Sequence, residues 1–160
     1  MTQTSPAPGS KPAPQKVTPF LWFDNTVEEA MTLYTSLFPN SHIVSLNRAG
    51  DRVFSGSFVL DGHTYHAFNG GPMFTFSEAF SLMVNCETQD EIDSLWTRLT
   101  ADGGQESRCG WLKDKFGLSW QIVPSVLLPL LQHPDPEKAK RVQQAMLGMN
   151  KLDIKGLQEA

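Results

Sequence analysis

The chain contains few cysteines and no apolar run long enough to suggest a targeting or membrane-spanning segment. Its 160 residues include two cysteines, Cys86 and Cys109, which do not form a Cys-x-x-Cys pair. This small number excludes a small secreted scaffold held together by disulfides. We therefore expect two reduced core thiols in a cytoplasmic protein without a membrane partner, and a reactive Cys109 is the alternative.

The chain also lacks an excess of positive charge. It has 13 Lys and Arg against 17 Asp and Glu, a formal net charge of −4, and its basic residues are scattered. A surface of this kind does not attract phosphate backbones. We therefore expect no nucleic-acid partner.

Glycine is missing from both segments in which a strand is predicted to lead into a helix, residues 24–26 and 85–88. Cofactors of the adenosylmethionine type usually bind at a glycine-rich turn between a strand and a helix. The residues therefore give no support to methyl transfer.

What the chain does contain is an internal repeat. Residues 20–24 and 26–30 recur as 81–85 and 88–92, and residues 62–68 recur as 117–123. In both copies a Thr-x-x-Glu sequence, Thr26 with Glu29 and Thr88 with Glu91, predicts a capping box at the start of a helix. A supersecondary unit of this length does not bury its own apolar face, so each copy is expected to need the other.

Each copy is predicted to contain a strand, a helix and three further strands, which gives an α+β fold. The predicted strands are residues 17–23, 41–47, 54–60 and 63–69, then 80–86, 105–108, 110–113 and 118–123, with helices at 26–38 and 89–101. Two more helices are predicted at 125–132 and 136–149, the second with an apolar stripe that packs on the sheet or on a second subunit. We predict a disordered tail at 1–16, a domain at 17–124 with modules 17–69 and 78–124, and a C-terminal helical extension of that domain at 125–160.

This pattern resembles the glyoxalase/bleomycin-resistance/dioxygenase superfamily, also called the vicinal oxygen chelate (VOC) superfamily. Within it the chain is most similar to the PhnB-like branch, whose members often carry the label demethylubiquinone methyltransferase. The resemblance is carried by residues 19–23, 38–41, 69–72, 84–88 and above all 109–124, Cys-Gly-Trp-Leu-Lys-Asp-Lys-Phe-Gly-Leu-Ser-Trp-Gln-Ile-Val-Pro. It implies two tandem modules whose mixed sheets curl into a cup for a small ligand or a metal, and a homodimer.

In metal-dependent members of the superfamily, each module supplies one metal ligand from its first strand and one from its last strand. The resemblance places these positions at Val17, His66, Glu78 and Gln121. Valine has no donor atom, and a glutamine carbonyl is a weak oxygen donor beside a carboxylate. We therefore expect a degraded metal site and no cofactor, with His66, Glu78 and Gln121 as the candidate ligands for a divalent metal.

The expected ligand pocket combines aromatic and polar side chains from both modules: Trp22, His66, Phe68, Glu78, Trp111 and Gln121. Of these, His66 is the candidate catalytic residue as a general base, and the alternative is a histidine satisfied by Gln121 or a backbone carbonyl. Trp22 and Trp111 either line the pocket or belong to the core. Asp114 and Lys115 are expected to form a solvated pair in a hairpin turn.

Three functions remain open at this point, and whether the protein is an enzyme is open with them. The favoured one is a small-molecule binding protein of the bleomycin-resistance type. The second is a metal-dependent lyase, isomerase or dioxygenase acting on a small vicinal-oxygen substrate, with His66 and Glu78 as surviving ligands. The third is a structural or partner-binding dimer that uses its C-terminal helices as the interaction surface.

Overall fold

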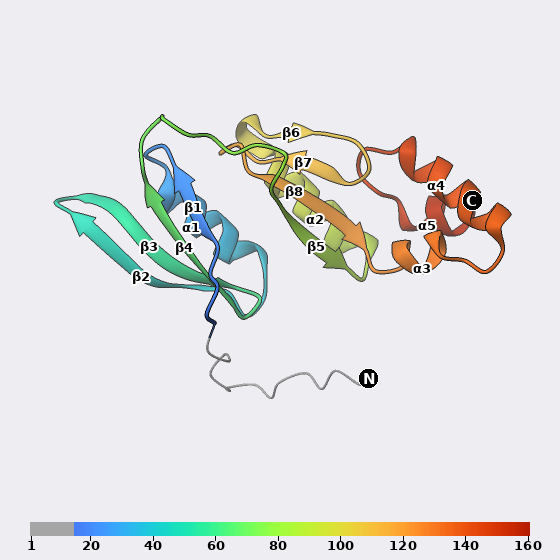
Figure 1. Ribbon diagram of the computed structural model, residues 1–160, viewed down its shortest axis with the longest axis horizontal. Helices are drawn as coiled ribbons and strands as arrows, with labels where there is room; N and C mark the ends of the chain where they lie inside the picture. The colour runs from blue at the N-terminus through green and yellow to red at the C-terminus, as the bar shows by residue number, and fades with distance from the viewer. Residues whose placement is uncertain (1–14) are drawn as a thin grey trace. The chain divides into compact units, whose positions relative to one another are not determined.

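The computed structural model describes residues 15–160, and the chain forms two compact units (Figure 1). The first unit ends at Phe74 and the second runs from Thr75 to Ala160. The predicted order of strand, helix and three strands is confirmed in both, and so is the α+β class. The first unit contains β1 (Phe20–Phe23), α1 (Val27–Leu37), β2 (His42–Ala49), β3 (Arg52–Leu60) and β4 (His63–Asn69). The second contains β5 (Ser81–Cys86), α2 (Gln89–Thr100), the short 3-10 helix η1 (Ala101–Gly103), β6 (Gln105–Glu106), β7 (Trp111–Lys113) and β8 (Ser119–Pro124), followed by α3 (Leu127–Leu131), α4 (Pro136–Leu147) and α5 (Ile154–Gln158).

Each unit has a four-stranded mixed sheet, with strand order β1-β4-β3-β2 in the first and β5-β8-β7-β6 in the second. The first and last strands of a module run parallel to each other, and the remaining pairs are antiparallel. This order brings side chains that are distant in the sequence into neighbouring positions on one sheet.

The tail predicted at residues 1–16 lies outside the described residues, apart from Gln15 and Lys16. The side chain of Gln15 exchanges hydrogen bonds with the backbone of Thr64.

A helix covers one face of each sheet, and the other face is turned away from that helix (Figure 1). In the first unit α1 packs on β3 so closely that a Cβ at Gly56 would lie 2.8 Å from the Cε of Met31. Tyr34 of α1 contacts the rings of Phe23 and Phe58, and all three side chains are buried. Because successive strand residues face opposite ways, Phe20, Trp22, His66 and Phe68 lie on the face opposite α1, here called the open face of the first sheet.

The strand pairing in the two sheets differs from the predicted alignment of β1 with β5, the first strands of the two modules. His66 and Gln121 are equivalent in the repeat, but His66 pairs with Phe20 whereas Gln121 pairs with Met83. Phe20 is therefore equivalent to Met83, and not to Ser81 as the sequence alignment had it. A shift of two residues leaves every side chain on the same face, so the apolar pattern does not reveal it.

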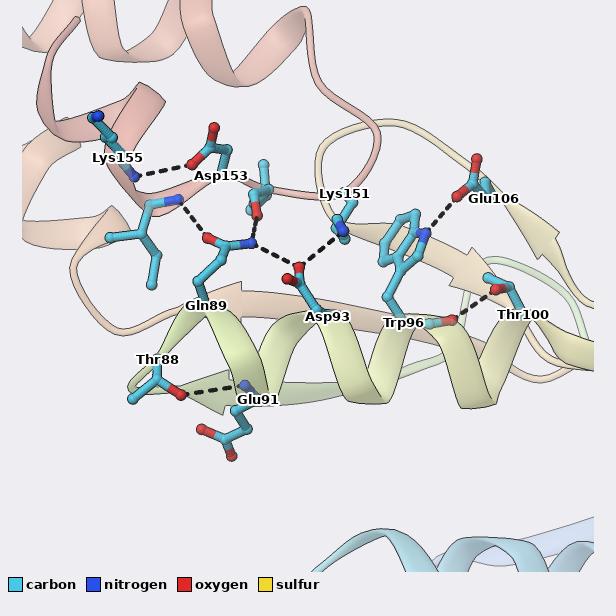
Figure 2. Close-up of polar contacts among 12 residues, drawn as sticks. Thr88, Gln89, Glu91, Asp93, Trp96, Thr100, Glu106, Lys151, Asp153 and Lys155 are labelled. Carbon is cyan, nitrogen blue, oxygen red and sulfur yellow. Dashed lines mark hydrogen bonds and ion pairs between the residues drawn. The ribbon is translucent and has the colours of Figure 1, made fainter.

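Of the two predicted capping boxes, only the one at Thr88 forms its cap hydrogen bond. The Glu91 amide donates to the Thr88 hydroxyl oxygen at 3.2 Å (Figure 2). The Glu91 carboxylate accepts from the amide of Glu87, the residue before the cap, and not from that of Thr88 as predicted. The prediction for Thr26 is wrong: its ψ is 15°, against 156° for Thr88, and its side chain makes no cap hydrogen bond. Instead the Val27 amide donates to Oδ1 of Asn69, from the end of β4, at 3.0 Å.

This difference predicts unequal effects of the same substitution. Thr88→Ala is expected to cost about 1 kcal/mol of stability, because the Glu91 amide loses its acceptor. Thr26→Ala is expected to cost less than about 0.5 kcal/mol, the usual range for a side chain without such a contact. Urea unfolding of the two variants checks this, and an equal loss in both would contradict the assignment of the caps.

The C-terminal extension has its own small core. Its buried side chains are Leu127, Val142, Leu152 and Leu157, and Met146, Met149 and Val123 pack against them. The predicted apolar stripe of α4 therefore packs within the extension and on the end of β8. The short helix α5 was not predicted. Among the described residues, no helix combines the length and the apolar character needed to cross a bilayer.

Hydrogen bonds and an ion pair link the C-terminal extension to α2 (Figure 2). The Gln89 side chain donates to the Leu152 carbonyl at 3.0 Å and accepts from the Ile154 amide at 2.8 Å. Lys151 forms an ion pair with Asp93 at 2.8 Å, and the carboxylate of Asp93 also accepts from Gln89. These contacts make the extension part of the second unit.

Asp114 is not the solvated turn residue that was predicted, since its side chain is only 3% exposed. Its Oδ1 accepts from the amides of Phe116 at 2.9 Å and Leu118 at 3.1 Å, and its Oδ2 accepts from the indole of Trp120 at 2.9 Å. Lys115 lies 5.3 Å from the centre of the Phe116 ring. The carboxylate therefore organises the β7–β8 turn and fixes a core tryptophan.

Candidate functional site

Three aromatic side chains and a histidine form a continuous surface on the open face of the first sheet. The Phe20 ring lies 6.4 Å from the His66 imidazole at an interplanar angle of 26°, and 5.1 Å from the Phe68 ring. Trp22 meets Phe68 edge-on at 4.8 Å and Phe74 at 5.0 Å. Phe20 is 64% exposed, so this surface is available for contact.

The Asn-Gly-Gly-Pro segment after β4 holds Trp22 in place. The Trp22 indole donates to the Gly71 carbonyl at 2.8 Å. The indole ring lies so close to Gly70 that a Cβ there would overlap it. The glycine is therefore needed for close approach of the backbone to the ring.

The neighbouring strands β3 and β2 make the same face polar. Ser57 pairs with His66 in the ladder, and its hydroxyl lies 2.7 Å from that of Ser45 on β2. One step along the strands, the Asn47 amide donates to the Ser55 hydroxyl at 3.0 Å. The open face therefore combines an aromatic half on β1 and β4 with a hydroxyl- and amide-bearing half on β3 and β2.

In the second unit, Gln121 and Trp111 lie side by side on β8 and β7, where they are ladder partners. The Gln121 amide donates to the Ser81 hydroxyl at 2.9 Å. Met83, the partner of Gln121 on β5, is largely exposed. The half-buried Trp111 and Gln121 thus share the sheet face with an exposed methionine.

Glu78 precedes β5 and forms an ion pair with Lys113 of β7 at 2.5 Å. The hydrogen bond from the Lys113 ammonium is the main cause that lowers the pKa of Glu78. Both side chains line a pocket of about 130 Å³ that also includes Trp111 and Ser119. Ser119 is 1% exposed, and its Oγ has no hydrogen-bond partner among the described protein atoms.

The structure groups the expected pocket residues by unit. Trp22, His66 and Phe68 share one face in the first unit, and Trp111 and Gln121 share one in the second. The convergence of His66 and Gln121 stays a prediction. A larger hollow of about 810 Å³ in the first unit lies beside the start of α1, and none of the expected residues lines it.

The expected metal ligands do not fit a divalent cation. Val17 offers no donor atom, Glu78 is paired with Lys113, and Gln121 offers only a neutral carbonyl oxygen, which is a weak donor beside a carboxylate. On the corrected register the first-module counterpart of Glu78 is Gln15, a second weak amide donor. Within residues 15–160, no group of three or more His, Cys, Asp or Glu side chains is placed to hold a metal ion. We therefore derive no chemistry through a metal.

Several residues at these sites were missed by sequence reasoning. Phe20 alternates with Trp22 on β1, Ser119 lies two positions before Gln121, and Lys113 lies two positions after Trp111. The period-2 facing of strands places each on the same face as its neighbour, so this signal was present in the sequence. The orphan hydroxyl of Ser119 was not foreseeable, because it depends on packing.

Both cysteines are free thiols. Cys86 is buried on the helix side of β5, and burial, together with the nearby carboxylates of Glu91 and Glu87, raises its pKa to about 12. It is therefore protonated and unreactive at neutral pH. The half-buried Cys109 has a φ of 58°, and its amide donates to the Met149 carbonyl.

Comparison with known proteins agrees with this architecture. The sequence profile of the family described as 3-demethylubiquinone-9 3-methyltransferase matches residues 15–123. A Bacillus cereus PhnB protein, described as a putative 3-demethylubiquinone-9 3-methyltransferase, is 38% identical, with a TM-score of 0.65 over 69% of this chain and 100% of that one. No curated protein matches the chain.

More distant structures share the fold alone. A Pseudomonas aeruginosa protein is 17% identical, with a TM-score of 0.58 over 69% of this chain and 98% of that one. A mutant of the Listeria monocytogenes fosfomycin resistance protein FosX, in complex with Mn(II) and a dihydroxypropylphosphonic acid, is 12% identical, with a TM-score of 0.50 over 66% of this chain and 88% of that one. With its two β-α-β-β-β modules and its profile match, the chain belongs to the PhnB-like family described as 3-demethylubiquinone-9 3-methyltransferase, which has the glyoxalase-like VOC fold.

Proposed function

We propose that the protein binds a small, mainly apolar molecule on the open face of the first sheet. The observation that carries this proposal is the continuous aromatic surface of Phe20, Trp22 and Phe68 beside the exposed His66. Apolar surface of this kind, flanked by a few polar groups, is typical of ligand sites. An aromatic ligand would stack on these rings, which contributes about 0.5–1.5 kcal/mol per ring pair beyond area burial.

The polar half of the face supports a ligand with a hydrogen-bonding substituent. Ser57 lies next to His66 in the ladder, so a hydroxyl and an imidazole flank the aromatic surface. Each of these groups has both donor and acceptor capacity. In this proposal His66 holds the ligand by a hydrogen bond and is the candidate general base if a reaction follows.

The proposal also covers the remaining expected pocket residues. Within the second unit, Glu78, Trp111 and Gln121 are the candidate ligand-binding residues, and the protein acts as a homodimer. Two unbridged thiols suit the reducing conditions of the cytoplasm. Neither methyl transfer nor metal-dependent catalysis is proposed, because the strand-to-helix turns lack glycine and the metal donor set does not fit.

A thermal-shift screen of small aromatic and heteroaromatic compounds tests this function. A compound present at 100 times its Kd is expected to stabilise the protein by about 2.7 kcal/mol, or about 5–10 °C in Tm. The matched variants are Phe20→Ala, on the open face, and Tyr65→Ala, which removes a ring of β4 that stacks on Phe58 on the α1 side of the same sheet.

Phe20→Ala is expected to weaken binding about tenfold, the equivalent of one lost aromatic contact, and Tyr65→Ala is expected to leave the affinity unchanged. A screen without any stabilising compound at saturating concentrations would contradict the proposal. Equal weakening by both variants would contradict the location of the site.

A further inference from the structure

The face of the second sheet opposite α2 carries a row of polar side chains. In the strand pairing Gln105 lies opposite Lys113, Lys113 lies opposite Ser119, and Ser119 lies opposite Ser81. Glu106, the residue after Gln105, bonds to an indole of α2, so the row faces the other way. Because opposite residues on neighbouring strands have Cβ atoms about 5 Å apart, these four residues, here called the polar row, form a continuous strip of N–H and O–H donors.

A pocket of about 130 Å³ includes three members of the polar row, Gln105, Lys113 and Ser119. Trp111 and Glu78 also line it. Four water molecules at ~30 Å³ each would fill such a space. The pocket therefore suits a compact group and not a large ring system.

Ser119 marks this pocket as a place for a hydrogen-bonding partner. Its side chain is 1% exposed, and among the described protein atoms its Oγ has no partner. The Ser81 hydroxyl on one side accepts from Gln121. The Lys113 ammonium on the other side is paired with Glu78. A buried hydroxyl without a partner is costly, so a native structure that retains one calls for an explanation.

The positive charge of the pocket has a partner that is easily replaced. Among the described residues that line the pocket, Lys113 alone is basic, and its side chain is 35% exposed on β7. Its partner Glu78 lies in a turn before β5, and its side chain is 64% exposed. Since exposed ion pairs contribute little to stability, the Glu78 carboxylate can leave the pocket at little cost while the ammonium stays in place.

We propose that this pocket binds a small carboxylate, which replaces the Glu78 carboxylate on Lys113 and accepts a hydrogen bond from the Ser119 hydroxyl. The group now paired with Lys113 is itself a carboxylate, so the ligand offers the ammonium the same kind of acceptor. Hydrogen bonds with one ionised partner are about twice as strong as neutral ones. A short aliphatic part of the ligand packs on the Trp111 ring. The inference rests on the proposed function in that Glu78 and Trp111 are among its candidate ligand-binding residues.

The same contacts disfavour a cation or a neutral ligand. A cation would have to take Glu78 from Lys113 and would then lie beside the freed ammonium. Glu106 does not attract a cation to this place, because its carboxylate lies on the α2 side of the sheet. A neutral alcohol of the same size gains a hydrogen bond from Ser119 but no charge pairing.

Titration of the full-length ¹⁵N-labelled protein with three probes of similar size tests the proposal. The probes are propionate, propan-1-ol and ethylammonium, at constant pH and ionic strength. Propionate is expected to shift the Trp111 indole and Ser119 amide resonances in a saturable way. Propan-1-ol and ethylammonium are expected to bind about tenfold more weakly or not at all, because they lack the charged contact with Lys113.

Replacement of Glu78 distinguishes a competing carboxylate from a structural one. Glu78→Gln removes the charge that holds Lys113, so propionate affinity is expected to rise about fivefold. Glu159→Gln is the matched control, since it neutralises another exposed glutamate that pairs with a lysine, Lys155, and is expected to leave the affinity unchanged. A gain in affinity cannot result from a damaged fold.

Two further variants test the groups that hold the ligand. Lys113→Gln is expected to lower propionate affinity about tenfold, and its control Lys155→Gln is expected to leave the affinity unchanged. Ser119→Ala, which removes only the orphan hydroxyl, is expected to lower the affinity about fivefold.

The absence of a saturable shift with propionate, equal binding of propan-1-ol, tighter binding of ethylammonium, or unchanged or weaker propionate binding in Glu78→Gln would overturn the proposal. These outcomes are separable from the compound screen on the first sheet. If aromatic compounds bind and propionate does not, only the carboxylate pocket is wrong. If propionate binds and the screen finds nothing, the aromatic site is wrong and the pocket stands.

Discussion

Replacement of Asp114 by alanine is expected to lower the free energy of unfolding by about 3–5 kcal/mol, because three donors lose their acceptor in a buried site. These donors are the amides of Phe116 and Leu118 and the indole of Trp120. Trp120 is fully buried in the core, so its indole has no access to water in exchange. A loss of this size corresponds to a fall in Tm of about 10 °C.

Thermal and urea unfolding of three variants measure this effect. Asp114→Asn keeps one acceptor oxygen and is expected to lose part of the stability. Asp51→Ala removes an exposed aspartate of the β2–β3 turn and is expected to change stability by less than about 0.5 kcal/mol. A loss of that small size for Asp114→Ala would show that the carboxylate does not organise the turn.

Leu152→Ala is expected to cost about 3 kcal/mol, as is usual when a fully buried leucine is truncated in a packed core. Leu152 joins the core of the extension to the Cys109-Gly110 segment, since a Cβ at Gly110 would lie 3.0 Å from its Cδ1. The amides of Cys109 and Gly110 also donate to the carbonyls of Met149 and Asn150, both at 2.8 Å. The variant therefore loosens both the extension and this segment of the sheet.

Urea unfolding checks the prediction, with Leu147→Ala as the control. Leu147 ends α4 and is 56% exposed, so its truncation is expected to change stability by less than about 0.5 kcal/mol. Similar losses in the two variants would mean that the extension is not anchored through Leu152.

The internal repeat was sufficient to predict both modules and the α+β class, because strand facing and helix periodicity are local properties of the sequence. The strand register was not predictable in the same way. A two-residue shift moves Phe20 from Ser81 to Met83 as its counterpart without changing which residues are apolar and buried. Register is decided by hydrogen bonds between distant strands.

The failures at Thr26 and Asp114 have a common cause. Both residues have the local sequence of an ordinary cap or turn, but their roles are set by residues far away along the chain or buried in the core. The side chain of Asn69 caps α1 in place of that of Thr26. The carboxylate of Asp114 is buried, where it accepts a hydrogen bond from the indole of Trp120. Polar side chains of these types bond to whichever backbone or side-chain group the fold brings close.

The candidate site was predictable in its parts. Alternation along β1 and β4 places Trp22, His66 and Phe68 on one face, and their role in ligand binding stays a prediction. The orphan hydroxyl of Ser119 depends on side-chain packing and on the partners of its neighbours. Sequence patterns carry no information on it.

A crystal structure of the protein with the most strongly stabilising compound from the screen tests the account most directly. The proposed function predicts that the compound lies on the open face of the first sheet, in contact with Phe20, Trp22 and Phe68 and within hydrogen-bond distance of His66. A compound bound on the α1 side of that sheet, or away from these residues altogether, would contradict it.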